Sequence, residues 1–264
     1  MTFVGAGWTW INAIPGFNEA NANLAHQFGN SFIEGNPVHS VIHIALSLVS
    51  VAIIAMFTLA TRAAWAKSKN PAIPAEGFSI RNFMEMILDT CLNLGEQVLG
   101  SRKQAERFLP LIGALAIYIF FHNVLALIPG MAPATDNLNV TVGPAIVVFL
   151  ATHFFGLKDN GTHYLAHFLG PKIGGFPWLF PLMLPIELIS HLARPLSLAL
   201  RLFGNMFGDH AVLAIFLGLL AIPIIYPVPI MLLGTVVVIV QTLVFCLLTL
   251  VYIALAIEHS EEAH

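Results

Sequence analysis

The hydrophobic and polar positions of this 264-residue chain form long apolar runs separated by short polar stretches. The first run, Ser40 to Thr61, covers 22 residues, and about 20 apolar residues suffice to cross a hydrocarbon core of about 30 Å as a helix. Similar runs follow, so we expect one membrane domain over 38–264 after a less regular segment at 1–37. The expected segments are spans at 38–62, 108–129 and 139–157, an interfacial helix at 78–101, and two long helices at 177–222 and 228–257.

The segment at 78–101 has the pattern of an amphipathic helix. Arg81, Glu85 and Asp89 recur every four residues, and apolar residues fill the opposite side. A helix with one charged face and one apolar face lies in the membrane interface and does not cross the bilayer. We therefore exclude this segment from the spans.

The last two apolar segments are longer than one crossing requires. At about 1.5 Å per residue, 177–222 would extend roughly 70 Å and 228–257 roughly 45 Å as helices. One strongly tilted crossing by the first helix uses this excess length, although two crossings remain an alternative. The predicted fold is an all-α polytopic membrane protein with about five membrane-crossing helices plus the interfacial helix, its last two helices forming a long tilted hairpin.

The composition supports a membrane protein. Hydrophobic residues make up 58% of the chain and charged residues only 9%, compared with about 25% charged in soluble domains. A net charge of −3 does not indicate nucleic acid as a partner. Cys91 and Cys246 lie in apolar stretches, where we expect small buried side chains without a disulfide.

The basic residues indicate an orientation. No Lys or Arg precedes Arg62, and several follow it directly. Because loops rich in Lys and Arg stay in the cytoplasm, segment 1–37 is expected outside and Arg62 inside. With a single crossing by 177–222, the C-terminal tail lies in the cytoplasm.

The stretch "RPLSLALRLFGNMFGDH", Arg194 to His210, places polar groups within an apolar run. At about 100° per residue, His210 falls opposite Arg201 on a helical wheel. An arginine at membrane depth costs about 2.5–3.5 kcal/mol or more, so it needs a partner. Glu187 and Asp209 lie about 21 Å and 12 Å from Arg201 along the helix axis, which favours a carboxylate from another chain. The polar residues within about 80° of Arg201 are Glu187, Ser190, His191, Arg194, Ser197, Asn205 and Asp209.

This stretch resembles the signature of the a subunits of rotary F-type ATP synthases, which has the form P-x-S-L-x-L-R-L-F-G-N-M. The segments "PATDNLNVT", "PLMLPIELISHLARP" and "QTLVFCLLTLVYIALAIE" extend the resemblance over most of the chain from residue 40. It implies a proton-translocating stator subunit with two offset aqueous half-channels beside a ring of c subunits. It also implies b-type peripheral-stalk partners, a bacterial plasma membrane location, no catalysis by the chain alone, and no cofactor or metal.

The resemblance assigns roles residue by residue. Arg201 matches the essential arginine, which faces the carboxylate of a passing c subunit. The polar neighbours of this arginine would be Asn205 and Gln241. Residues of the inner half-channel would be Glu187, Ser190, His191, Arg194 and Ser197, and those of the outer half-channel His210 and Asn123.

Two positions depart from the family pattern. Some relatives carry a titratable group where this chain has Gly234, and an acidic residue where it has Ala126. Asp209 or His122 is expected to supply the missing polarity. The coupling ion, proton or sodium, stays open.

Two alternative functions are a membrane di-iron oxygenase of the histidine-box kind and a stand-alone channel or secondary transporter. The pairs His39/His43 and His163/His167 have metal-ligand spacing, but no HExxH occurs, and we interpret them as interfacial histidines. His153 is expected to be a hydrogen-bonded core residue. A stand-alone channel or secondary transporter would also carry intramembrane charge, but we find no internal repeat of the kind transporters show.

Overall fold

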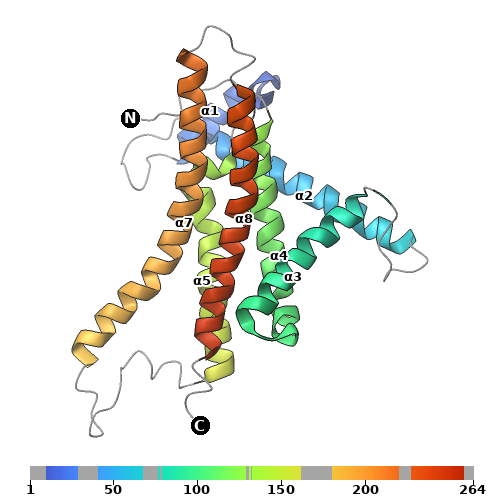
Figure 1. Ribbon diagram of the computed structural model, residues 1–264. Helices are drawn as coiled ribbons and strands as arrows, with labels where there is room; N and C mark the ends of the chain where they lie inside the picture. Colours follow the sequence, from blue (N-terminus) through green and yellow to red (C-terminus); the bar gives the residue numbers. More distant parts are fainter. Residues whose placement is uncertain are drawn as a thin grey trace, which may run out of the picture. The chain divides into compact units, whose positions relative to one another are not determined.

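The computed structural model describes residues 10–28, 41–67, 77, 79–128, 131, 133–161, 180–219 and 227–258. Every regular element within these residues is a helix (Figure 1), so the predicted all-α fold is confirmed. The helices are η1 (Trp10–Ala13), α1 (Phe17–Phe28), α2 (Ile42–Lys67), α3 (Ile80–Leu99), α4 (Arg102–Val124), η2 (Leu125–Leu127), η3 (Ala134–Asp136), α5 (Leu138–Asn160), α7 (Phe180–Leu219) and α8 (Pro227–Glu258).

Four helical stretches in the described part of the chain are long and apolar enough to cross a membrane. They are Ile42–Lys67, Arg102–Leu127, Leu138–Asn160 and Met231–Ile257. The two long helices predicted near the C-terminus are present as α7, with 40 residues, and α8, with 32 residues. At about 1.5 Å per residue, α7 is about 60 Å long, twice the thickness of a hydrocarbon core.

The chain divides into two compact units. The first unit consists of Met1–Asn82, Ile117–Val140 and Phe203–Gln241. The second consists of Phe83–Ala116, Thr141–Leu202 and Thr242–His264. Helices α3, α4, α5, α7 and α8 each contribute residues to both units. The hydropathy pattern gave no indication of this division within the expected membrane domain.

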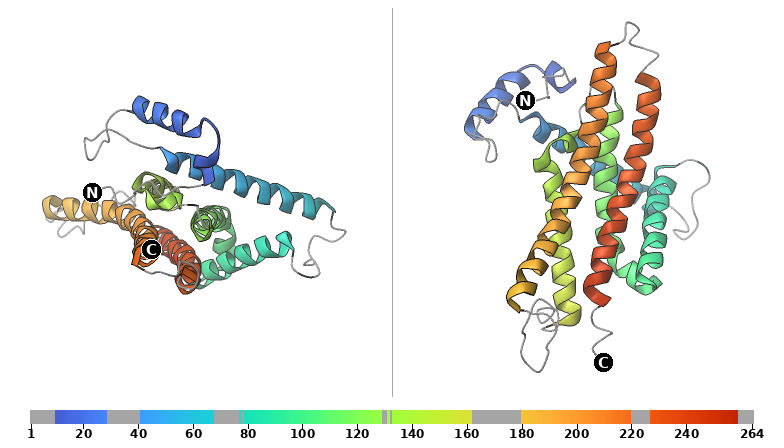
Figure 2. Two further views of the ribbon diagram at one scale, coloured as in Figure 1. Left: turned by 90° about the horizontal axis from the view of Figure 1, so that it is seen from above. Right: turned by 60° about the vertical axis from the view of Figure 1, so that its left-hand side comes forward.

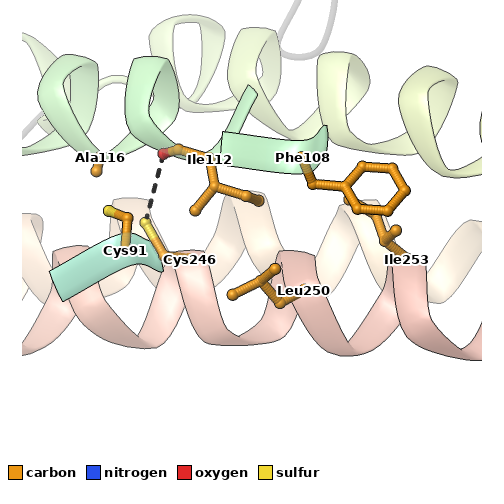
Figure 3. Packing of buried hydrophobic residues seen from close by; sticks show 7 residues of the cluster. All are labelled: Cys91, Phe108, Ile112, Ala116, Cys246, Leu250 and Ile253. Carbon is orange, nitrogen blue, oxygen red and sulfur yellow. Dashed lines mark hydrogen bonds between the residues drawn. The ribbon is translucent and has the colours of Figure 1, made fainter. Parts of the chain in front are cut away.

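The second unit has a core built from α3, α4 and α8 (Figure 3). Cys246 lies with its Sγ 3.9 Å from the carbonyl oxygen of Ile112. Both cysteines are buried, as predicted. The buried members of this core are Cys91, Phe108, Ile112, Ala116, Cys246, Leu250 and Ile253.

Small residues let α3 approach α4 closely in this unit. A Cβ on Gly113 would lie 2.7 Å from Cδ2 of Leu88, and a Cβ on Gly95 would lie 3.1 Å from Cβ of Ala105. Figure 2 shows α3 running beside the C-terminal part of α8. A larger side chain at Gly95 would force the helices apart, because Cβ of Ala105 cannot rotate away, whereas one at Gly113 would require the Leu88 side chain to turn.

Polar contacts join the ends of α4, α5 and α8 in the second unit. Arg107 donates two hydrogen bonds of 2.8 Å to the carboxylate of Asp159, and its guanidinium lies 5.5 Å from the ring centroid of Phe155. Asn160 donates a 2.7 Å hydrogen bond to the carbonyl oxygen of Ala256. These contacts fix the register of three helices.

The expected polar face of α3 differs at its first residue. Asp89 is exposed, but Arg81 is only 4% exposed. A long arginine stem can cover apolar surface while its charged head keeps polar contacts. The charged face predicted for α3 is therefore exposed at Asp89 but not at Arg81.

The first unit has its own small core near the N-terminus. Ile11, Leu46 and Ala134 are buried together, which joins η1, α2 and η3. The backbone N–H of Val41, just before α2, donates a 2.9 Å hydrogen bond to Oδ1 of Asn21 in α1. Because Ala134 belongs to this core, η3, which also contains Thr135 and Asp136, is held against α2.

Candidate functional site

The polar stripe of α7, meaning the polar residues predicted to share one face with Arg201, lies along the border between the buried and the exposed side of the helix. Ser190 and Ser197 are exposed, and Arg201 is half-buried. These three polar residues therefore lie on a side of α7 that the described residues do not fully cover. The residues that α7 buries include His191, Leu198, Leu202 and Met206.

Arg201 makes no hydrogen bond or ion pair with any residue that the structure describes. Its guanidinium cannot be neutralised, since its pKa in water is above about 12. A charge of this kind at membrane depth is costly without an anionic partner or water. The site therefore leaves Arg201 available to a carboxylate from outside the chain.

Asn205, one turn after Arg201 on α7, is joined to Gln241 on α8. Its Nδ2 donates a hydrogen bond to Oε1 of Gln241, and both residues belong to the first unit. Gln241 is only 3% exposed, and its Nε2 has no hydrogen-bond partner among the described residues. A buried donor without a partner costs about 1–3 kcal/mol, so this atom is suited to bind a water or an incoming polar group.

In the second unit, the earlier turns of α7 carry three further polar residues, Glu187, His191 and Arg194. Nε2 of His191 lies 3.2 Å from Oε1 of Glu187, so His191 is one partner of this carboxylate. Arg194 instead lies over the ring of Tyr252 on α8, with 5.6 Å from Cζ to the ring centroid. Tyr252 was not anticipated, because an aromatic residue in an apolar run gives no sign of which helix it faces.

Asn123 and His122 on α4 are fully buried in the first unit. Oδ1 of Asn123 accepts a 2.8 Å hydrogen bond from Thr135, and its Nδ2 has no partner among the described residues. Nδ1 of His122 lies 2.9 Å from the carbonyl oxygen of Tyr118, so Nδ1 carries a hydrogen, and Nε2 lies 3.1 Å from the hydroxyl oxygen of Ser47. Both ring nitrogens of His122 thus have a hydrogen-bond partner, and Asn123 keeps one donor available.

Asp209 fills the space beside Gly234. A Cβ built on Gly234 would lie 2.9 Å from Oδ2 of Asp209 and 3.4 Å from Cδ2 of Leu127. The carboxylate on α7 therefore occupies the room that a side chain on α8 would need. His210, the next residue, is half-buried. Ala126 adds no polar group, so the polarity beside Gly234 comes from Asp209.

Asp136 is a further acidic residue of the first unit, in η3 beside Thr135. Burial raises its pKa from 3.8 to about 6. Asp136 belongs to the motif "PATDNLNVT", but the sequence pattern alone indicates no role for it. Asp136 directly follows Thr135, which donates a hydrogen bond to Asn123, and this proximity to Asn123 could not be predicted from the sequence.

The histidine pairs with metal-ligand spacing are mostly outside the described residues. His39, His163 and His167 lie outside the described residues, and His43 is the one member of the two pairs that lies within them. Among the described residues, no group of three or more His, Cys, Asp or Glu side chains could hold a metal ion.

Comparison with known proteins gives consistent matches. A family model described as "ATP synthase A chain" matches residues 44–254. The chain is 40% identical to ATP synthase subunit a of Sorangium cellulosum, over 94% of each chain. It is 42% identical to ATP synthase subunit a 1 of Syntrophotalea carbinolica, over 88% of this chain and 94% of the relative. It is 45% identical to ATP synthase subunit a of Trichlorobacter lovleyi, over 82% and 85%.

Proposed function

Because the chain belongs to the ATP synthase A chain family, we propose how its own residues carry protons past Arg201. The family function is proton translocation in the membrane sector of the F-type ATP synthase. The residue roles that follow extend this function to particular side chains.

The observation that carries the proposal is the lack of a partner for Arg201 among the described residues. Its partner is the membrane carboxylate of a c subunit, which passes the uncovered side of α7. An opposite charge within about 4–6 Å favours the ionised carboxylate, so the rotor group releases its proton as it approaches. The fixed charge also opposes a proton that would pass directly from one half-channel to the other.

The outer half-channel is formed by polar residues of the first unit. Asn123 offers its free Nδ2 to entering water, and His210 and Asp209 exchange the proton. Asn205 and Gln241 hold the helices together at the level where the proton reaches the rotor. His122, hydrogen-bonded to Ser47 and Tyr118, adds a titratable group to this route beside Asn123.

The inner half-channel is formed by the earlier turns of α7 in the second unit. Glu187 and His191 form the hydrogen-bonded pair that accepts the released proton. Ser190 and Ser197, which the chain leaves exposed, border the water that leads to the cytoplasm. Arg194 is held by Tyr252 and keeps the region hydrated.

The assembly and orientation follow from the same reasoning. The c-ring covers the uncovered side of α7, and b-type peripheral-stalk subunits hold the chain still against it. The chain lies in a bacterial plasma membrane with its N-terminus outside and its C-terminus in the cytoplasm. It performs no catalysis by itself. Purification from native membranes should bring c subunits and a peripheral ATPase with it, whereas a stand-alone transporter would purify without them.

Cysteine labelling from each side tests the two half-channels. His210→Cys and Ser190→Cys are introduced into a Cys91→Ala, Cys246→Ala background, and a membrane-impermeant thiol reagent is added to sealed vesicles of either orientation. Position 210 should react from the outside and position 190 from the cytoplasm. Leu192→Cys is the control, since Leu192 is an exposed apolar residue of α7 and should resist a water-borne reagent. Reaction of 190 and 210 from the same side would contradict the proposal.

A further inference from the structure

The single turn η3 is joined to the buried amide of Asn123 in the first unit. Thr135 and Asn123 are both fully buried, and Oγ1 of Thr135 donates a 2.8 Å hydrogen bond to Oδ1 of Asn123. Ala134, on the other side of Thr135 in the chain, is also fully buried and packs against α2. These contacts fix the turn on two sides and hold Asp136 one residue from the hydrogen-bond partner of Asn123.

The carboxyl group of Asp136 has no hydrogen-bond or ion-pair partner among the described residues. Burial alone raises its pKa to about 6, because a carboxylate loses hydration when it is buried. On the turns of α2 and α4 that are joined to η3, the titratable residues are His43 and His122. Neither of them, nor the exposed Glu19 on α1, contributes to this shift.

A structural role does not explain this buried carboxyl group. A carboxylate stabilises a fold when it accepts hydrogen bonds or pairs with a cation in the folded state, and the described residues offer Asp136 neither. Titratable groups whose pKa is shifted by burial are common at functional sites. A second group in the same place lacks a partner: Nδ2 of Asn123 is buried and donates to no described residue. Buried donors of this kind bind ordered water.

The segment between α4 and α5 lies on the outer side in the proposed orientation. Residues 125–137 contain no Lys or Arg, whereas Arg62 and Lys67 end α2, and Arg102 and Lys103 begin α4. Because loops rich in Lys and Arg stay in the cytoplasm, protons from the outside reach this segment first. Asp136 is only half-buried, so water from the outside can reach its carboxyl group.

We infer that Asp136 is the proton-collecting residue of the outer half-channel, taking protons from the outside water and passing them to a water bound at Nδ2 of Asn123. A hydronium ion gives its proton to the carboxylate, which becomes a neutral carboxylic acid, and the ion leaves as water. The acid then gives this proton to the water at Asn123, and the carboxylate is restored. This inference rests on the proposed function, because it adds a residue of η3 ahead of Asn123 on the same route.

Two substitutions distinguish a proton carrier from a structural side chain. Asp136→Asn keeps the size of the side chain but cannot titrate, and it should not destabilise the fold, because the carboxyl group it removes has no partner among the described residues. Asp136→Glu restores a carboxyl group on a longer stem. Glu19→Gln is the matched control, because Glu19 is an exposed residue of the same unit and its substitution also removes one negative charge.

The test is ATP synthesis by the whole complex in vesicles, with the outer-side pH varied from about 5 to 8 at constant total driving force, since a pH profile reports the pKa of an essential acid or base. Asp136→Asn should make ATP about three- to tenfold more slowly and without the pH dependence that wild type shows around the pKa of Asp136. The loss is smaller than the 10²–10⁴ typical of a positioned acid or base, because water can deliver some protons to Asn123 directly. Asp136→Glu should recover most of the rate, and Glu19→Gln should match wild type. A wild-type rate and pH profile for Asp136→Asn would overturn the inference.

A second measurement does not depend on the rate of the asparagine variant. Asp136→Cys in the Cys91→Ala, Cys246→Ala background should react with a membrane-impermeant thiol reagent added from the outside. Absence of this reaction, or reaction from the cytoplasmic side alone, would contradict a residue that collects protons from outside. Arg201→Ala in the same preparation separates the two claims. If it loses ATP synthesis while Asp136→Asn behaves as wild type, only the present inference fails, and if it keeps ATP synthesis, the proposed function fails.

Discussion

Gly234→Ala is expected to impair proton pumping with little effect on stability. The added Cβ would lie 2.9 Å from Oδ2 of Asp209, so the carboxylate has to move by about 0.5 Å to reach an ordinary contact of about 3.4 Å. Overpacking costs about 1–3 kcal/mol, but here the atom that moves is the end of a flexible side chain. Replacing glycine in a helix regains about 0.8–1 kcal/mol. The net change in unfolding free energy should therefore stay within about 1 kcal/mol.

The functional effect of this substitution should be larger than its effect on stability. Asp209 would be pushed out of the position beside α8 from which it serves the outer half-channel. We expect ATP-driven pumping in vesicles to fall several-fold while the melting temperature of the purified complex changes little. Gly143→Ala is the control, because no atom lies within 4 Å of a Cβ built on Gly143.

A double variant tests whether pumping requires a carboxylate in the space between Asp209 and Gly234. Asp209→Gly with Gly234→Asp places a carboxylate in the same space from α8 instead of α7. It should pump faster than Asp209→Gly alone. Wild-type pumping by Gly234→Ala, or no gain in the double variant, would refute the reasoning about this space.

Three further predictions concern stability. Because burial raises the pKa of Asp136 from 3.8 to about 6, folding favours its protonated form, and stability is lost as the pH rises from about 4 through 6. The unfolding free energy of Asp136→Asn should therefore exceed that of wild type by up to about 3 kcal/mol at pH 8, at about 1.36 kcal/mol per pKa unit, with no gain at pH 4. Equal gains in melting temperature at both pH values would contradict this cause. Gly95→Ala should lower stability by up to about 2 kcal/mol, because its Cβ would lie 3.1 Å from Cβ of Ala105, which cannot rotate away, and the overpacking cost of about 1–3 kcal/mol exceeds the roughly 0.8–1 kcal/mol that alanine regains in a helix; an unchanged melting temperature would argue against the close packing of α3 and α4. Arg107→Gln should cost about 1 kcal/mol by removing the two hydrogen bonds to Asp159, and the same loss in a variant that already carries Asp159→Asn would show that the pair is not its cause.

The sequence predicted the helices and the polar stripe because both depend on local pattern. A long apolar run determines that a helix forms and roughly how long it is, and the wheel around Arg201 determines which residues share its face. These features need no knowledge of how the helices pack. The pairing of Glu187 with His191 is of the same kind, since the two lie one turn apart.

Contacts between helices could not be predicted in this way. Hydropathy does not fix the rotation of a helix, so the position of Asp209 beside Gly234 and of Tyr252 beside Arg194 had no local signal. His153 was interpreted as a core residue for the same reason. Its hydrogen bond to Phe149 fits that interpretation, but its ring contact with His191 becomes visible only when α5 and α7 are packed together.

The orientation of the chain can be checked independently. Cysteines at positions 5 and 262, labelled from each side of sealed vesicles, should react from opposite sides, the first from outside and the second from the cytoplasm. Labelling of both from one side would exclude a single crossing by α7.

The central claim is that Arg201 couples proton flow to rotation and blocks direct leakage. The most direct measurement is ATP synthesis and passive proton permeability in vesicles that hold the assembled complex with Arg201→Ala, beside Arg201→Lys and Arg194→Ala. Arg201→Ala should abolish synthesis and raise passive permeability, and Arg201→Lys should also fail, because an ammonium lacks the planar fork and can lose its proton when buried. Arg194→Ala should keep partial coupling. Synthesis by Arg201→Ala at an appreciable fraction of the wild-type rate would contradict the claim.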